Sequence, residues 1–320
     1  MREAEDWAQA LEADLKRAQH NDTRLLDATP LRDLIQRYID EVSLKKLGAK
    51  QEIVRLKAWL RHPLADRPIS RCLPKDFADH IAQRRKDKSK RGGGVAEQTI
   101  KHELIAISNV FESARRDWGY AIENPTKKIS KPGGSQARDV RIPPDIWPKL
   151  SDELRKCRNK QYVVIAEFAI ETGMREDELM RMAWRDLDKA RRIVEVWGKD
   201  TSSRSGQRKK RLVPLSPRAM ELLGTLPQAL DSSALVFQTV RKTSADGLSR
   251  AFTSACKKIG IEGGVFHCTR HEAASRMAPH YPMLTLMAIM GWKTPAMAAR
   301  YYHAGVDELH AGIERMQAAR

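Results

Sequence analysis

Cysteine is scarce in this chain of 320 residues, and its four cysteines show no metal-ligand spacing. They are Cys72, Cys157, Cys256 and Cys268. This scarcity excludes a disulfide-stapled scaffold and indicates a reducing environment. Long apolar runs are also missing, because none approaches the ~20 residues that a membrane helix needs. The charged start, Met1–Trp7, lacks the apolar core of a signal peptide, so the sequence predicts a cytoplasmic protein without a membrane partner.

Sequence signatures of nucleotide or metal chemistry are missing as well. Gly92–Gly94 is not followed by the lysine and serine that end a phosphate-binding loop. His271 and Glu272 are not followed by a second histidine at the spacing of a helical zinc site. No acidic cluster suggests a two-metal nuclease. We therefore expect a reaction that uses no ATP, no metal and no other cofactor.

Positive charge, in contrast, is abundant. The chain has 58 lysines and arginines against 41 aspartates and glutamates, a net charge of +17. This excess favours a polyanionic partner, because binding releases the counterions condensed on phosphates. Acidic proteins and membranes stay open as partners on charge alone. Hydrophobic residues make up 41% of the chain, enough for the cores of two domains at this length.

Apolar residues at helical spacing organise the first part of the chain. Residues 3–19 have helical composition, and residues 1–28 form a separate N-terminal segment. Thr29 and Pro30 predict a helix cap followed by proline at the first helical position. Further helices are expected near residues 50–61, 74–86 and 96–118, with no strand before residue 130. Together these patterns predict a small helical domain over residues 29–125.

A basic segment rich in proline and glycine, residues 126–143, follows the helical domain. Its composition suits an extended linker, although a solvated loop fits equally well. Its five cations are Lys127, Lys128, Lys131, Arg138 and Arg141.

The remaining residues, 144–320, predict a second domain that is mainly helical with a small antiparallel sheet. An apolar helix over Tyr162–Thr172 stops at Gly173, and a new helix starts over Glu176–Trp184. Arg192–Trp197 and Arg211–Leu215 are predicted strands on either side of a polar hairpin tip. Other helices are expected near residues 144–157, 217–226, 246–259, 269–278 and 282–290. A last helix carries Tyr301, and an amphipathic tail begins near residue 306.

Three local patterns in this domain carry the chemistry. They contain Arg175 in Thr172–Leu179, Arg270 in His267–His271, and Tyr301 within Gly291–His303. Two arginines, a third hydrogen-bond donor and a phenol are what phosphoryl transfer to a phenolic oxygen requires. The order of these patterns and the residues within them resemble the tyrosine recombinases, the phage integrase family, and the resemblance covers nearly the whole chain.

The resemblance assigns a role to each residue. Arg175 and Arg270 would stabilise charge on the attacked phosphate, since a guanidinium stays charged and offers parallel hydrogen bonds. Glu178, three residues after Arg175, would support that arginine. His267 would handle a proton or contact the phosphate, and His271 would orient its neighbours. Taken alone, each of these residues also fits a structural role.

Tyr301 is the expected nucleophile. Tyr302 is adjacent, and the interval from Trp292 in the family selects Tyr301. Trp292 occupies a position where most family members have histidine. An indole offers one N–H donor and exchanges no proton, so proton transfer is excluded there while a hydrogen bond to phosphate is not.

Lys199 would be the general acid for the leaving 5′ oxygen, because the family places a lysine at the start of this hairpin. The hairpin is longer than is common, which leaves Lys209 and Lys210 as competitors.

The basic linker and the hairpin are expected to contact DNA. The residues concerned are Lys127, Lys128, Lys131, Arg138 and Arg141 in the linker, with Arg204, Arg208, Lys209 and Lys210 in the hairpin.

The resemblance implies a site-specific recombinase that cleaves and rejoins double-stranded DNA through a 3′-phosphotyrosine. It implies a two-domain clamp, with a core-DNA-binding domain (29–125) and an α/β catalytic domain (144–320), and a tetramer on synapsed DNA. Residues 1–28 would be a lead-in to, or remnant of, an arm-binding module. An apolar stripe in the tail (Val306, Leu309, Ile313, Met316) would dock on a neighbouring protomer or on its own domain.

Several functions remain open at this stage. Integration, excision and inversion all fit, and Arg270–Arg276 is similar to a segment of shufflon-type inversion recombinases. A DNA-relaxing enzyme related to type IB topoisomerases would use similar pocket chemistry. A catalytically silent DNA-binding protein on the same fold is the third alternative.

Overall fold

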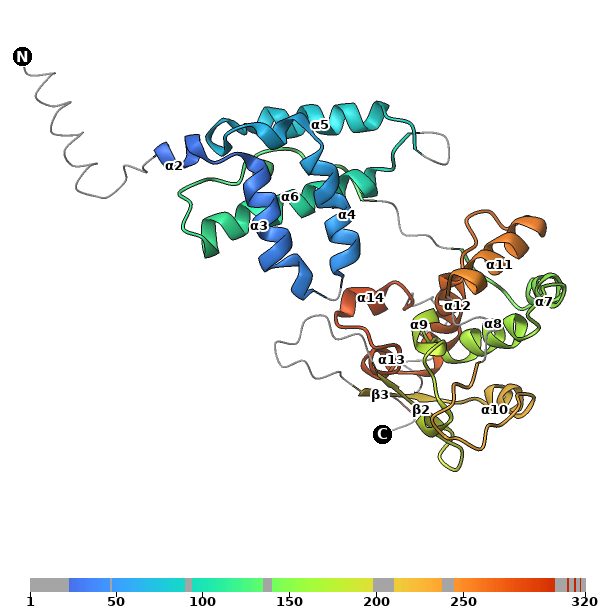
Figure 1. Ribbon diagram of the computed structural model, residues 1–320. Coiled ribbons are helices and arrows are strands. Elements are labelled where there is room, and N and C mark those ends of the chain that lie inside the picture. The colour runs from blue at the N-terminus through green and yellow to red at the C-terminus, as the bar shows by residue number, and fades with distance from the viewer. Residues whose placement is uncertain are drawn as a thin grey trace, which may run out of the picture. The chain divides into compact units, whose positions relative to one another are not determined.

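The computed structural model describes residues 23–46, 48–89, 94–134, 140–197, 210–237 and 245–302, together with His310, Glu314 and Gln317. The chain forms two compact units, Met1–Gln136 and Ala137–Arg320, and Figure 1 labels most of their helices and strands. The predicted helix over residues 3–19 and the apolar stripe of the tail lie outside the described residues. None of the described helices is long and apolar enough to span a membrane.

The described part of the first unit is helical. Apolar residues recur along one face of α3 and are buried there: Leu31, Leu34, Ile35, Tyr38 and Ile39. Pro30 itself is the N-cap, so the helix begins one residue later than the sequence predicted. The α-helices of this unit are Thr23–Ala28 (α2), Leu31–Glu41 (α3), Ala49–Leu60 (α4), Pro74–Lys86 (α5) and Glu97–Asp117 (α6).

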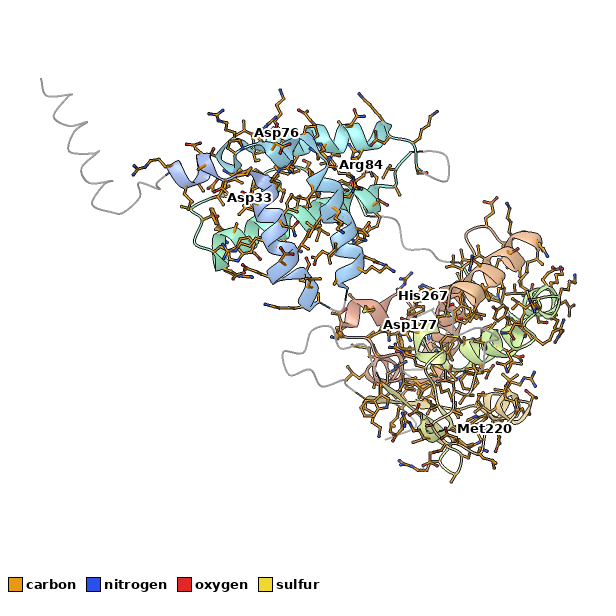
Figure 2. The ribbon with its side chains drawn as sticks, viewed as in Figure 1. Asp33, Asp76, Arg84, Asp177, Met220 and His267 are labelled. Carbon is orange, nitrogen blue, oxygen red and sulfur yellow. The ribbon has the colours of Figure 1, made fainter. Side chains whose placement is uncertain are left out.

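One buried residue, Glu103, ties three of these helices together. Glu103 on α6 accepts hydrogen bonds from Nε and Nη2 of Arg84 on α5 at 2.9 and 2.7 Å, and Arg84 is labelled in Figure 2. The backbone oxygen of Glu103 also accepts from the indole of Trp59 on α4 at 3.0 Å. Burial alone raises the pKa of Glu103, but His80 and Arg84 outweigh it and lower that pKa to about 2. The carboxylate therefore stays charged, and the three helices are held as one body.

The second unit combines helices with a three-stranded antiparallel sheet in the order β1-β2-β3. Val194 pairs with Val213 and Trp197 with Lys210, so the valines share the buried face of the sheet. The strands are Leu187–Asp188 (β1), Ile193–Trp197 (β2) and Lys210–Pro214 (β3). The helices are Trp147–Arg155 (α7), Gln161–Thr172 (α8), Glu176–Leu179 (α9), Pro217–Gly224 (α10), Ala245–Lys258 (α11), His267–Met277 (α12), Met283–Met290 (α13) and Pro295–Ala299 (α14).

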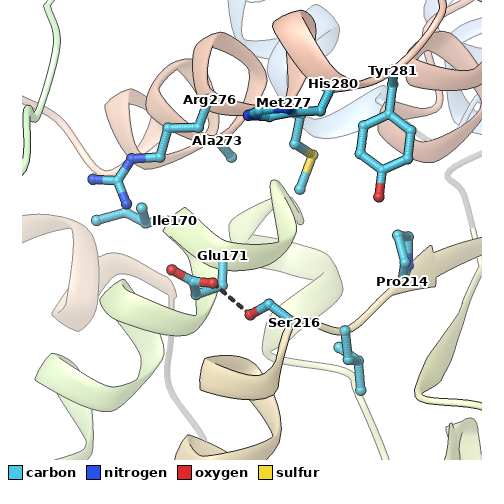
Figure 3. A pocket seen from close by; sticks show the side chains of 10 residues that line it. Ile170, Glu171, Pro214, Ser216, Ala273, Arg276, Met277, His280 and Tyr281 are labelled. Atoms are coloured by element: carbon cyan, nitrogen blue, oxygen red, sulfur yellow. Dashed lines mark hydrogen bonds between the residues drawn. The ribbon is translucent and has the colours of Figure 1, made fainter.

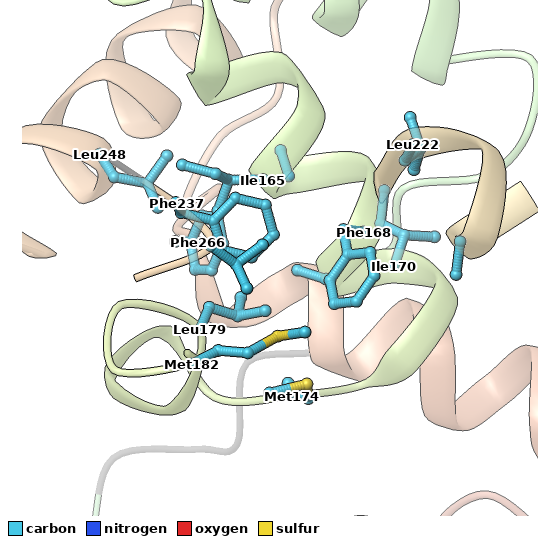
Figure 4. Packing of buried hydrophobic residues seen from close by; sticks show 14 of the residues in the cluster. Ile165, Phe168, Ile170, Met174, Leu179, Met182, Leu222, Phe237, Leu248 and Phe266 are labelled. Carbon is cyan, nitrogen blue, oxygen red and sulfur yellow. The ribbon is translucent and has the colours of Figure 1, made fainter. Parts of the chain in front are cut away.

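The core of this unit surrounds α8, the most apolar of its long helices. Figure 4 shows Ile165 and Phe168 of α8 among side chains from other elements, including Phe237 and Phe266. Full burial of such a side chain contributes about 1.5–3 kcal/mol. Gly173 ends α8 in the left-handed conformation, with φ at 64°. The end of α8 is thereby locked against α12 and α13, because a Cβ at Gly173 would lie 2.6 Å from Sδ of Met290 and 3.3 Å from Cβ of Ala273.

The structure corrects several predicted boundaries. The helix expected over Glu176–Trp184 is only the four-residue α9, and the short strand β1 was not predicted. Helix α12 begins at His267, two residues earlier than predicted, with Phe266 at the N-cap position. Helix α14 ends at Ala299, so Tyr301 lies after the helix rather than in it. The residues of interest thus sit mostly at helix ends, where backbone groups are unpaired and can hold side chains.

Candidate active site

Arg175 lies at the N-terminus of α9, directly after the turn that ends α8. The carboxylate of Glu178 accepts from the backbone N–H of Arg175 at 2.7 Å and from its Nη1 at 3.0 Å. About 40% of the Arg175 side chain is exposed, whereas that of Glu178 is 3% exposed. Glu178 therefore holds the guanidinium from its buried side and leaves its other edge open to a ligand.

Arg211 on β3 binds the same carboxylate and is a site residue that the sequence analysis did not identify. Its Nη1 and Nη2 each donate to Glu178 at 2.9 Å, and its side chain is only 11% exposed. Burial raises the pKa of Glu178, but Arg211 and Arg175 outweigh it, so the pKa lies below its ordinary value. A signal was available: strand alternation places Arg211 on the same face as the buried Val213.

Arg270 is the fourth residue of α12 and is almost fully buried, with 4% exposure. Its Nη1 donates to the carbonyl of Gly173, at the end of α8, and its Nη2 to that of Met290, at the end of α13. These carbonyls form the negative ends of two helix dipoles. Burial, and then the charges of Arg175 and Arg211, lower the pKa of Arg270 to about 9, which keeps the side chain cationic at neutral pH.

The turn that ends α13 gathers all three arginines. Successive backbone carbonyls in this turn accept one hydrogen bond each from Arg211, Arg270 and Arg175. In that order, the carbonyls belong to Ile289, Met290 and Gly291. Gly291 adopts the left-handed conformation, and a Cβ there would lie 3.0 Å from Cδ of Arg211. A glycine is therefore needed for the turn to end the helix and accommodate the arginine.

Tyr301 faces the same region. Its hydroxyl lies 2.6 Å from Nδ1 of His271, and its ring stacks on Trp292 with centroids 5.2 Å apart and planes 7° apart. Trp292 in turn lies 5.9 Å from the guanidinium carbon of Arg270. The Tyr302 hydroxyl instead donates to the backbone oxygen of Tyr281 at 2.6 Å. The two adjacent tyrosines thus lie in different environments, and Tyr301 is the one beside the histidines.

His267 is exposed at the start of α12, where Figure 2 labels it. Its ring makes an edge contact with His271, with centroids 5.2 Å apart. Desolvation, the neighbouring His271 ring and the positive charges of Arg270 and Arg175 lower the pKa of His267. His267 is therefore neutral at pH 7 in the free protein.

Part of the predicted lysine and DNA-contact set lies outside the described residues. This part comprises Lys199, Arg204, Arg208, Lys209 and Arg138.

The described members of that set differ in their surroundings. Lys210 forms an ion pair with Glu195 on the sheet. In the linker, Lys127 pairs with Glu112, Lys128 with Glu123 and Arg141 with Glu272, while Lys131 is exposed.

Two cavities of the second unit are separate from the cluster around Arg270 and Tyr301. The first, of about 250 Å³, is lined by Glu171, Ser216, Arg276 and Tyr281, among others (Figure 3). The second, of about 640 Å³, reaches Glu178 from the side of β2. Neither cavity is lined by His267, His271 or Tyr301. Among the described residues, no three histidine, cysteine or acidic side chains gather as a metal site.

Known proteins with a similar sequence or fold include recombinases and integrases. The model of the phage integrase family matches residues 141–308. A shufflon-specific DNA recombinase of Escherichia coli is 29% identical over 88% of this chain and 70% of its own length. The solved Tn1549 transposon integrase, in complex with a circular intermediate DNA, has the same fold at 18% identity, with a TM-score of 0.69 over 90% of this chain and 100% of that chain. A lambda integrase tetramer on a Holliday junction has a TM-score of 0.68 at 19% identity, and the match covers 90% of this chain and 80% of that chain.

The family match spans more than half of the 320 residues, and the chain belongs to the phage integrase family. Its mainly helical fold with a small antiparallel sheet, predicted from sequence, is confirmed. The protein is a site-specific DNA recombinase of the tyrosine type, an enzyme of strand breakage and rejoining.

Proposed function

We propose that Tyr301 is the nucleophile and that it attacks a phosphodiester held by Arg175 and Arg270. The Tyr301 oxygen forms a bond to phosphorus while the bond to the 5′ oxygen breaks, leaving a 3′-phosphotyrosine and a free 5′ hydroxyl. His271 receives the phenol proton, and Lys199 supplies a proton to the leaving oxygen. Rejoining is the reverse attack by a second 5′ hydroxyl, so no external energy source is needed.

The observation that carries this proposal is the chain of contacts from Tyr301 through Trp292 to Arg270. The phenol hydroxyl lies against His271 while its ring stacks on the indole that covers the arginine. Stacking of this kind fixes the direction of the phenol, which is needed for in-line attack. In this role Trp292 positions the nucleophile and offers an N–H donor, without exchanging a proton.

The charges of the site favour the transition state of attack on a phosphodiester. Arg175 and Arg211 bind the carboxylate of Glu178, and Arg270 adds a third guanidinium nearby, so positive charge exceeds negative charge among these four side chains. A phosphodiester gains negative charge as it is attacked, and fixed cationic donors stabilise that charge. Binding of the phosphate also raises the lowered pKa of His267, since a negative charge then offsets the nearby cations. A proton on His267 adds a further donor to the bound phosphate.

The partner in this proposal is double-stranded DNA in the cytoplasm. The helical unit is the core-DNA-binding domain (29–125), joined by the basic linker (126–143) to the catalytic domain (144–320), and the two clamp the duplex. Strand exchange takes place in a tetramer, as suggested by the lambda integrase tetramer on a Holliday junction. The linker lysines, Arg138 and the hairpin cations bind the DNA backbone. Lys210, paired with Glu195, is a weaker candidate for the general acid than Lys199.

A suicide substrate tests the proposed chemistry. Nicked duplexes made from the DNA flanking the gene should become covalently attached to the wild-type protein, because the nicked strand escapes and the phosphotyrosine accumulates. Paired sites in direct and inverted orientation then separate excision from inversion, and similarity to a shufflon-specific recombinase favours inversion. Supercoil relaxation without synapsis indicates a topoisomerase-like enzyme. DNA binding without any adduct indicates a silent DNA-binding protein.

Arg211 is proposed as a positioning residue for Arg175, through Glu178. Arg211→Met removes both hydrogen bonds to the carboxylate, and we expect the single-turnover cleavage rate to fall about 10- to 100-fold, since a charge-assisted pair is worth roughly 1.5–3 kcal/mol. The dissociation constant for DNA should change little, and Arg211→Lys should recover part of the rate.

The matched control is Arg218→Met, because Arg218 is an exposed arginine that bridges Glu167 and Glu221 outside the pocket. Cleavage by this control should match wild type. Equal cleavage rates for Arg211→Met and Arg218→Met, with both proteins folded by thermal melting, would show that Arg211 has no positioning role.

A further inference from the structure

Glu272 is a buried carboxylate on the helix that carries three of the pocket residues. Its side chain is 1% exposed and accepts three hydrogen bonds. The donors are Nε of Arg141 at 2.8 Å, the backbone N–H of Ile142 at 3.2 Å and Nε of Arg276 at 2.8 Å. A buried carboxylate is tolerated when it is paired and hydrogen-bonded in this way. Glu272 therefore binds the end of the linker and its own helix at once.

Glu272 and Arg270 lie on opposite sides of α12. Glu272 follows Arg270 by two residues, which is about 200° around a helix. One side of α12 thus carries Arg270 into the pocket, while the opposite side is tied to the linker. Ile142 is fully buried in the core of the unit, so the linker end is fixed there by packing as well. The contact therefore joins the end of the linker directly to α12.

We propose that Glu272 anchors the linker to the catalytic helix and that Arg141 is a positioning residue held by Glu272 rather than a phosphate contact. The inference rests on the proposed function and deepens it, because it makes linker placement on DNA a condition for an aligned pocket. It also gives a reason for the segment Arg270–Arg276: Glu272 and Arg276 form the half of the anchor that belongs to α12. Arg276 lies among the side chains that line the cavity of Figure 3.

The experiment compares Arg141→Ala, Glu272→Gln and their double variant by DNA affinity and by single-turnover cleavage of the nicked duplex. We expect each single variant to cleave about tenfold more slowly once bound, with unchanged affinity, because a charge-assisted bond behind Arg270 is lost. The double variant should be no slower than the worse single one, since both changes break the same contact. Arg141→Lys should recover part of the rate.

Lys131→Ala is the matched control for a phosphate contact. Lys131 is an exposed linker cation, and its loss should weaken binding and reduce the salt slope by about one. If Arg141→Ala behaves in the same way, Arg141 is a phosphate contact and the anchor is refuted. The anchor is equally refuted if the two single variants slow cleavage independently. Thermal melting of each variant guards against loss of fold.

Failure of the anchor can be told apart from failure of the proposed function. Adduct formation by the wild-type protein is measured first, because it tests the proposed chemistry whether or not the anchor exists. A wild type that cleaves, with Arg141 and Glu272 variants that cleave equally fast, overturns the anchor alone. A wild type that forms no adduct on any flanking sequence overturns the proposed function, and with it the anchor.

Discussion

Tyr301→Phe is expected to abolish the covalent adduct while leaving DNA binding intact. The change removes only the hydroxyl that attacks phosphorus, and the ring can still stack on Trp292 at the same 5.2 Å spacing. No other described group replaces it, because the adjacent Tyr302 hydroxyl donates to the backbone oxygen of Tyr281. Denaturing gels of the protein incubated with the nicked duplex measure the adduct, and gel shifts measure binding.

Tyr302→Phe is the matched control for this experiment. It removes the same atom from the neighbouring residue and loses a hydrogen bond worth about 1 kcal/mol of folding stability. The adduct should form at the wild-type rate, with a slightly lower melting temperature. An adduct that is lost in Tyr302→Phe and retained in Tyr301→Phe would move the nucleophile by one residue and refute the assignment.

Arg270→Lys is expected to slow cleavage about 100- to 1,000-fold, the usual effect of losing one preorganised donor to a developing oxyanion. A lysine keeps the charge but cannot offer the planar fork that bridges the carbonyls of Gly173 and Met290 while facing the phosphate. One of these carbonyls then loses its partner, so the melting temperature should fall too. Rapid-quench measurement of adduct formation at saturating DNA isolates the chemical step.

Arg218→Lys provides the control, because Arg218 is an exposed arginine of the same unit that bridges two glutamates outside the pocket. Its cleavage rate should equal that of wild type. A cleavage rate for Arg270→Lys within about threefold of this control corresponds to a barrier change below ~1 kcal/mol. That result would show that Arg270 is not a transition-state donor.

The strongly periodic segments of the sequence predicted their elements well. Helix α8 ends at Gly173 as expected, because a long apolar run followed by glycine has few other local solutions. Strands β2 and β3 also lie where alternation placed them, around Val194 and Val213. Short elements were missed: α9 stops after four residues and β1 has two, lengths at which periodicity carries no signal.

The pocket could be predicted only in part. Residue type and order suggested Arg175, Arg270 and Tyr301, and the resemblance suggested Glu178 as the support of Arg175. No local pattern indicated Arg211 or the helix-end carbonyls that hold Arg270. Arg211 was noted only as part of a strand, yet it grips Glu178 across 33 residues of sequence. Arg141 was expected to contact DNA, and its ion pair with Glu272 spans 131 residues. Contacts over such separations depend on how the elements pack, which a single sequence does not reveal.

What the amino-acid sequence determined by itself is the chemistry available: a strongly basic chain, two arginine patterns, a tyrosine at the right interval and a tryptophan where histidine is common. Tertiary structure decided how that chemistry is arranged. The end of α13 presents consecutive carbonyls to three arginines, and Tyr301 rather than Tyr302 meets His271. The physical reason is that unpaired groups at helix ends bind side chains wherever packing brings them, and local sequence patterns do not record that placement.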